Sequence, residues 1–157
     1  MTSIPPRDFF LGLDLGQVRD PSAIAVVQRS WLQGKDTPQD PVRFVSYYLC
    51  GYLRRWPLGT SYSEIVRAVA DLVRQPPLDW PTLAIDATGC GLPVIDSFKA
   101  ANIQAVIRPI LITAGHVTNI NDSGCFCVPK VDLVGVTRVI LDNRRLQIAD
   151  VPDSPTA

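Results

Sequence analysis

Two aspartates stand in apolar segments that have the character of β-strands. Asp14 lies in Phe-Leu-Gly-Leu-Asp-Leu-Gly and Asp86 in Leu-Ala-Ile-Asp-Ala-Thr-Gly. An ionised carboxylate is costly to bury alone, so an acid in such a segment is normally paired, hydrogen-bonded or bound to a metal ion. Two carboxylates on adjacent strands, about 4.8 Å apart, can share one divalent cation. Alternatively, each aspartate caps the loop that follows it, as aspartate often does before glycine.

Strand alternation places both acids on faces that carry small side chains. Asp14 shares its face with Gly12 and Gly16, and Asp86 shares its face with Ala84 and Thr88. Ligands that are all oxygen suit Mg²⁺ or Mn²⁺ better than zinc. Two such ions, roughly 3.5 to 4 Å apart, activate water and stabilise the leaving oxygen of a phosphodiester. We therefore predict that Asp14 and Asp86 are both the metal ligands and the catalytic residues of a hydrolase.

The hydrophobic pattern predicts the elements that must bring these two acids together. Strands are expected over 9–15, 22–28, 42–53, 83–87 and 103–112, and helices from Ser61 to the break at Pro76-Pro77 and over 93–101. A hairpin or loop over 115–124, a helix beginning at Pro129 and a short strand over 146–149 follow. The order β-β-β-α-β-α-β indicates an α/β fold, a mixed sheet with helices on its faces. Right-handed crossovers put the fourth strand parallel to the first and beside it, so the two acids should converge.

Size and charge limit the classes of protein that fit. The 157 residues suit one domain, 1–157, and 46% apolar residues are enough for a packed core. Fifteen basic residues balance fifteen acidic ones, which excludes binding of polyanions by bulk charge. The sequence shows neither a membrane-spanning run nor a signal peptide, so we expect a cytoplasmic protein that is not secreted. Four irregularly spaced cysteines favour reduced thiols over disulfides or a zinc site.

Four segments in a fixed order resemble a known family. Residues 12–28, 83–98, 128–135 and 145–149 resemble the nuclease domain of bacteriophage terminase large subunits, and the resemblance extends from about residue 9 to 150. It implies an RNase H-like fold and a metal-dependent endonuclease that hydrolyses concatemeric viral DNA during packaging. By this resemblance Asp14 matches the acid of the first strand and Asp86 the acid of the fourth, and the complete site holds two Mg²⁺ or Mn²⁺ ions.

The resemblance also implies a set of partners, and the sequence lacks two features of the family. Double-stranded DNA, a terminase ATPase domain, the small terminase subunit and the portal would be the partners, in the cytoplasm of a bacterial host. The sequence has no G-x-x-x-x-G-K-[ST] motif, so we expect no ATPase domain within it. The family's last metal-binding acid lies on a closing C-terminal helix in a paired-aspartate motif, which this sequence lacks. The acids that do not match that motif are Asp132, Asp142, Asp150 and Asp153.

Three basic residues are candidates for contact with DNA. Lys130 follows Pro129 at the expected start of a helix, where backbone N–H groups favour a phosphate. Arg54 and Arg55 precede Trp56, and cations beside an aromatic ring can hold a nucleic-acid strand by phosphate contact and stacking. The alternatives are ordinary solvation of Lys130 and a solvated loop in which only the indole is anchored.

Two other classes of function fit parts of the sequence. One is a DNA-binding or assembly module that keeps the fold without a complete metal site. The other is a nucleotide-binding fragment of the actin and sugar-kinase type, since Gly89 and Gly91 precede a helix that could cradle a phosphate. Proteins of that second type need two such domains, which 157 residues cannot supply.

Overall fold

The computed structural model describes residues 7–16, 19–33, 44–89 and 92–150. In these residues the strands are β1 (Asp8–Asp14), β2 (Ala23–Gln33), β3 (Phe44–Arg55), β4 (Thr82–Asp86), β5 (Val106–Thr113), β6 (Asn119–Ile120), β7 (Phe126–Pro129) and β8 (Leu146–Ile148). The helices are α1 (Tyr62–Val73), α2 (Leu92–Ala100) and α3 (Lys130–Asp142). The predicted order β-β-β-α-β-α-β is confirmed from β1 to β5.

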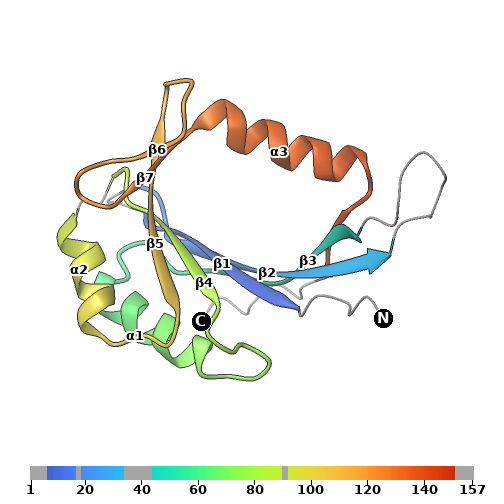
Figure 1. Ribbon diagram of the computed structural model, residues 1–157. Helices are drawn as coiled ribbons and strands as arrows, with labels where there is room; N and C mark the ends of the chain where they lie inside the picture. The colour runs from blue at the N-terminus through green and yellow to red at the C-terminus, as the bar shows by residue number, and fades with distance from the viewer. Residues whose placement is uncertain (1–6, 17–18, 34–43, 90–91, 151–157) are drawn as a thin grey trace.

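The described strands form one mixed sheet in the order β6-β7-β5-β4-β1-β2-β3-β8 (Figure 1). β1 and β2 are antiparallel, as are β2 and β3, whereas β4 runs parallel to both β1 and β5. The fourth strand therefore lies beside the first and parallel to it, as the crossover rule predicts. This arrangement around β1 is the RNase H-like α/β fold expected from the sequence.

The hydrophobic core lies between the sheet and the helices α1 and α2, which cover the same face (Figure 1). Strand residues such as Leu11, Ile24 and Ile85 alternate inward, and α1 packs Ile65 and Val69 against them. All five side chains are at most 2% exposed. We call this side of the sheet the core face and the opposite side, where Asp14 and Asp86 lie, the acid face.

The predicted capping box at the start of α1 is confirmed. The Ser61 side chain accepts a hydrogen bond from the Glu64 N–H, and the Glu64 carboxylate accepts one from the Ser61 N–H. The Ser61 hydroxyl also donates to the Glu64 carboxylate at 2.8 Å, and this hydrogen bond, followed by the one from the Ser61 N–H, holds the pKa of Glu64 below its ordinary value. The glutamate is thus explained by helix capping, as the sequence indicates.

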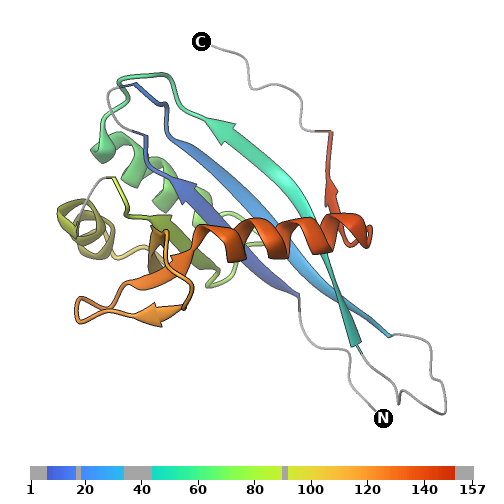
Figure 2. The same ribbon diagram turned by 90° about the horizontal axis from the view of Figure 1, so that it is seen from above.

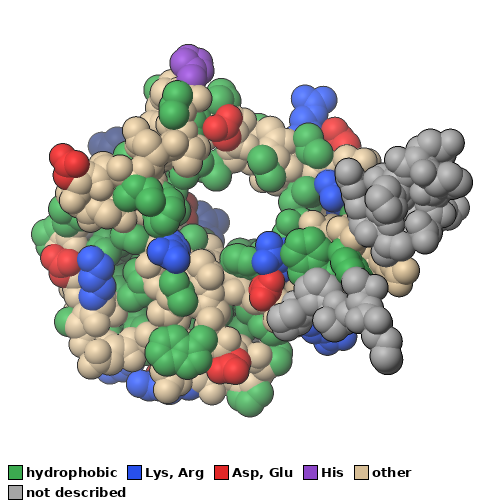
Figure 3. Space-filling model, in the orientation of Figure 1, with side chains coloured by type: hydrophobic (Ala, Val, Ile, Leu, Met, Phe, Trp, Pro, Cys, Tyr) green, Lys and Arg blue, Asp and Glu red, His purple; other side chains and the backbone are tan. Residues whose placement is uncertain are grey.

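The helix α3 lies over the acid face and connects β7 to β8, which pairs with β3 at the far edge of the sheet (Figure 2). Helices therefore lie on both sides of the sheet, as expected. None of the described residues of α3 is buried. An opening separates this helix from the sheet in the space-filling view (Figure 3), so its apolar side chains, among them Val134 and Val136, remain exposed.

The turn-rich segment after β5 contains one short strand. β6 pairs antiparallel with β7, and the Asn121 side chain accepts hydrogen bonds from the N–H groups of Ser123 and Cys125 between them. The expected hairpin is therefore present, and turn chemistry explains its asparagine. Across the described part of the chain, no helix has the length and apolar character needed to cross a membrane.

We predict that the conservative substitution Ile85→Val lowers the free energy of unfolding by about 0.5 to 1.5 kcal/mol. Ile85 is fully buried beside Asp86, so removing one methylene leaves a small cavity under the acid pair. Ile148→Val, the same change at a side chain that is 63% exposed on β8, should change it by less than about 0.5 kcal/mol. Urea unfolding followed by circular dichroism measures both. Equal losses in the two variants would contradict the assigned core.

Candidate functional site

The parallel pairing of β1 and β4 sets Asp14 directly beside Asp86. Five residue pairs define this register, from Phe10 opposite Thr82 to Asp14 opposite Asp86. Residues paired in this way point to the same face, and neighbouring strands lie about 4.8 Å apart. The structure therefore brings together the two acids that the sequence singled out, at the C-terminal ends of both strands.

The space in front of the two acids is open. Gly12 and Ala84, which precede them on the same face, are also paired with each other. Among the described residues, no atom outside Gly12 and its two chain neighbours lies within 4 Å of the position that a Cβ on Gly12 would take. A ligand can therefore approach the carboxylates from the acid face, and Asp14 is itself exposed to solvent.

Asp86 is oriented by the loop that follows it. Its Oδ1 accepts a hydrogen bond of 2.9 Å from the Thr88 N–H. The Thr88 hydroxyl in turn accepts one from the Ile112 N–H, and Ala87 donates to the Ile110 carbonyl. The loop-capping alternative is thus correct for Asp86. It does not exclude metal binding, because a carboxylate has two oxygens and four lone pairs.

The pKa of Asp14 is raised above its ordinary value. Partial desolvation at the strand end is the largest cause, and repulsion from Asp86 and then from Asp20 adds to it. Within the described residues no hydrogen bond reaches the Asp14 carboxylate, so loop capping does not explain this acid. Among the described residues, Asp14 therefore lies beside like charges with no hydrogen-bond donor to offset them, and a bound cation would relieve this repulsion.

A third acid, Asp20, lies near Asp14, and the sequence pattern alone does not predict it. The backbone of Asp20 and Pro21 approaches Gly16 so closely that a Cβ on Gly16 would collide with it. The Gly16 N–H donates to the Ser22 hydroxyl at 3.0 Å, and the Tyr62 hydroxyl donates to the Gly16 carbonyl at 3.1 Å. Glycine at this position thus lets the loop fold back and bring Asp20 within electrostatic reach of Asp14. In the sequence, the only indication of this loop is Gly16 followed six residues later by Ser22. That spacing is too common to predict that Asp20 lies near Asp14.

These residues fit a hard divalent cation in part. Asp14 and Asp86 supply oxygen ligands at neighbouring positions, which suits Mg²⁺ or Mn²⁺. In the described ranges no group of three or more acidic, histidine or cysteine side chains is arranged to hold a metal ion. The carboxylate pair is therefore a candidate for one shared ion, and a second ion needs ligands from elsewhere.

A β-bulge decides which of the two predicted arginines faces the acids. Val26 pairs with Tyr52 and Val27 with Cys50, so Gly51 is the extra residue on β3. Beyond this bulge Arg54 pairs with Ile24 on the core face and Arg55 with Ala23 on the acid face. Because Ala23 also pairs with Asp14, Arg55 lies two strands from Asp14, about 10 Å away between Cα positions.

Arg54 and Lys130 have different surroundings. The Arg54 guanidinium stacks on the indole of Trp56, 5.0 Å from its centroid, and the indole is buried. This matches the alternative of a solvated arginine beside an anchored tryptophan. Lys130 is exposed at the first residue of α3, directly after Pro129.

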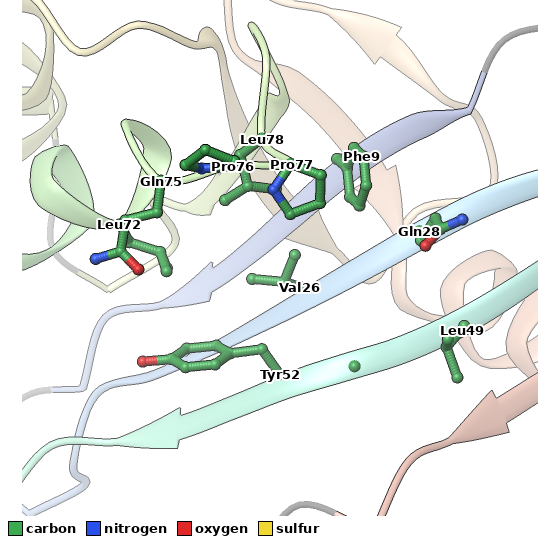
Figure 4. Close-up of a pocket in the computed structure, with 11 residues that line it drawn as sticks. Phe9, Val26, Gln28, Leu49, Tyr52, Leu72, Gln75, Pro76, Pro77 and Leu78 are labelled. Atoms are coloured by element: carbon green, nitrogen blue, oxygen red, sulfur yellow. The ribbon is translucent and has the colours of Figure 1, made fainter.

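A cavity of about 290 Å³ lies on the core face (Figure 4). Phe9 and Val26 from the sheet and Leu72 and Leu78 from α1 and the following segment line it. Its described lining residues include no carboxylate, histidine, lysine or arginine. The sheet separates this cavity from Asp14, so the cavity and the acid pair are separate features on opposite faces.

The fold and the paired acids define an RNase H-like α/β protein with two carboxylates at the ends of adjacent parallel strands. No protein-family model matches the sequence, and no curated protein matches it significantly. Among solved structures, the chain is similar to the large terminase of bacteriophage HK97, with 15% identity and a TM-score of 0.46. The match covers 97% of this chain and 32% of the terminase, so the chain spans about a third of that protein. The fold assignment rests on the strand order and directions.

We predict that Gly16→Ala lowers the free energy of unfolding by about 1 to 3 kcal/mol, because its methyl group collides with the backbone at Asp20. Gly12→Ala is the matched control, since its methyl group enters open space. The control should change stability by less than about 0.5 kcal/mol. Thermal unfolding of both variants measures the difference, and equal behaviour would contradict the close approach of the loop.

We predict that Asp14→Asn makes the metal-free protein more stable at neutral pH. A raised pKa means that the folded state resists ionisation of Asp14, so the penalty is fully present above the folded-state pKa. It disappears as the pH falls below the ordinary pKa of aspartate in the unfolded chain. The melting temperature of the Asp14→Asn variant should therefore exceed that of the native protein at pH 7 and approach it near pH 3. A lower melting temperature at pH 7 would contradict the repulsion described above.

Proposed function

We propose that this protein is the metal-dependent endonuclease domain of a phage terminase large subunit, hydrolysing phosphodiesters of concatemeric viral DNA. The observation that carries the proposal is the pairing of Asp14 with Asp86 on an open sheet face. The resemblance of four ordered segments to terminase nuclease domains supports the choice of substrate. Double-stranded DNA, an ATPase domain, the small terminase subunit and the portal are the proposed partners.

The chain's own residues have distinct roles in this proposal. Asp14 and Asp86 would bind Mg²⁺ or Mn²⁺ and orient it at the carboxyl ends of β1 and β4. When bound, the metal supplies Lewis-acid stabilisation of charge on the reacting phosphate and lowers the pKa of water. The Thr88 N–H fixes the orientation of Asp86. Arg55 on the acid face and Lys130 at the start of α3 would contact DNA phosphates.

A DNA-binding or assembly module is the second candidate. It is favoured by one finding, that the described residues supply two paired carboxylates but no larger ligand cluster. The nucleotide-binding alternative depends on the segment after Gly89, and Gly91 lies outside the described residues. Binding of a divalent cation by the acid pair of β1 and β4 is required for the proposed nuclease. Neither of the two alternatives requires it.

Plasmid cleavage in the presence of Mn²⁺ tests the nuclease proposal. We expect Asp14→Asn and Asp86→Asn each to lower the cleavage rate by on the order of 100-fold or more, because losing one ligand removes several kcal/mol of transition-state stabilisation. Chelation of the metal should abolish cleavage by the native protein.

Asp71→Asn is the matched control for charge. Asp71 is an exposed acid on α1, on the core face, and forms an ion pair with Arg74 at 3.3 Å. This variant should cleave at the native rate, since an exposed ion pair contributes little. Equal cleavage by the native protein and by the Asp14→Asn and Asp86→Asn variants would refute the assignment. Folded protein that binds DNA but never cleaves it would establish the module instead.

A further inference from the structure

A second arginine on the acid face lies on the side opposite to Arg55. Arg108 of β5 pairs with Ala84, which lies two residues before Asp86 on the same face. Its guanidinium carbon lies 5.4 Å from the centroid of the Phe126 ring. Arg108 is exposed, and Phe126 is partly buried. The ring thus limits the directions that this long side chain can take.

The registers of five strand pairs align these groups in one row across the acid face. In order, the row contains Arg55, Ala23, Asp14, Asp86, Ile110 and Phe126. The two acids occupy its centre. Arg55 is two strands from Asp14, and Phe126, with the Arg108 guanidinium stacked on it, is two strands from Asp86. Each arm of the row is therefore about 10 Å long between Cα positions.

The charge of Arg108 is available to a ligand, unlike that of Arg29 on the same sheet. Arg29 lies between the rings of Phe10 and Trp31, but its guanidinium also forms an ion pair of 2.6 Å with Asp8. Arg108 forms no ion pair with any described residue. A guanidinium that is ordered by an aromatic ring and lacks an acidic partner matches a phosphate well, since its planar donors can bind two oxygens at once.

We propose that Arg108, ordered by Phe126, binds a backbone phosphate of the nucleic-acid strand on the β7 side of the acid pair, and that this strand follows the row from Arg55 to Phe126. The inference rests on the proposed function, because it takes DNA as the ligand. Arg55 holds the strand on the β3 side, so the phosphates between the two contacts pass over Asp14 and Asp86. Arg108 and Arg55 are substrate-binding residues, and Phe126 is a positioning residue.

The amino-acid sequence alone does not reveal that Arg108 and Phe126 are neighbours. Arg108 and Phe126 are 18 positions apart and belong to strands separated by the β6 hairpin. Only the parallel pairing of β5 with β7 makes them diagonal neighbours on one face.

Fluorescence anisotropy with a short labelled duplex, measured over a series of salt concentrations without Mn²⁺, tests the proposal apart from cleavage. We expect Arg108→Ala to weaken binding by about tenfold and to reduce the slope of log affinity against log salt by about one, which corresponds to one lost phosphate contact. Arg74→Ala removes the same charge from the C-cap of α1, on the core face, where Arg74 forms an exposed ion pair with Asp71 at 3.3 Å. This matched control should leave both affinity and slope unchanged.

Substitutions of Phe126 separate positioning from bulk packing. Phe126→Leu keeps an apolar side chain but removes the ring, so we expect weaker binding of DNA with an unchanged salt slope, because Arg108 still carries its charge. Phe126→Tyr keeps the ring and should restore native affinity. If Phe126 had only a structural role, Phe126→Leu would lower stability and DNA affinity together. Phe126→Tyr would then not restore DNA affinity independently of stability.

The outcomes distinguish this inference from the nuclease proposal. Native affinity and slope in Arg108→Ala overturn the inference even if the native protein cleaves plasmid. The expected losses in Arg108→Ala support it even if no variant cleaves, in which case only the proposed hydrolysis fails. Failure of the native protein to bind the duplex at any salt concentration overturns both the DNA track and the role of Arg108.

Discussion

The repulsion between two carboxylates on adjacent parallel strands is the constraint on which the site depends. The hydrogen-bonded ladder between β1 and β4 fixes Asp14 beside Asp86 whatever their charge, because the backbone sets the register. Repulsion and partial desolvation raise the pKa of Asp14, so the arrangement carries a cost in the folded state. The packed core on the opposite face, which includes the fully buried Ile85, stabilises the fold and offsets the unfavourable free energy of ionised Asp14 beside Asp86. Such a cost is typical of sites prepared for a cation.

The two faces of the sheet differ in composition: one forms the hydrophobic core and the other carries the paired acids. Large apolar side chains alternate toward α1 and α2 and form the core, whereas the acid face carries small residues near the acids. Gly12 and Ala84 are small and paired with each other, and the space in front of Gly12 is open among the described residues. Arg108 and Phe126 lie farther out on the same face, as the proposed DNA track requires. With zero formal charge for the whole chain, the proposed recognition of DNA would depend on such local placement.

Local pattern and chain order were enough to predict the core of the fold and the acid pair. Apolar segments around Asp14 and Asp86, together with the crossover rule, predicted that β1 and β4 are parallel neighbours, and Ser61 with Glu64 predicted the start of α1. The face of Arg55 was not predictable, because it depends on the bulge at Gly51. Without that extra residue, strand alternation would place Arg54 on the acid face.

Long-range contacts account for the other features that the sequence did not reveal. The proximity of Asp20 to Asp14 depends on a backbone contact at Gly16, and the stacking of Arg108 on Phe126 depends on the β5–β7 register. The apolar positions of α3 are typical of a buried helix, yet the described part of this helix has no buried residue. Periodicity reports that a helix forms, but it does not report how closely that helix approaches the sheet.

The most direct test of the acid pair is a crystal structure of the protein soaked in Mn²⁺, with the metal located by its anomalous scattering. The expected result is an anomalous peak between the Asp14 and Asp86 carboxylates, at the 2.0 to 2.6 Å distances roughly typical of hard cations bound to oxygen. Anomalous density at other acids, with none between these two, would contradict the assignment of this site.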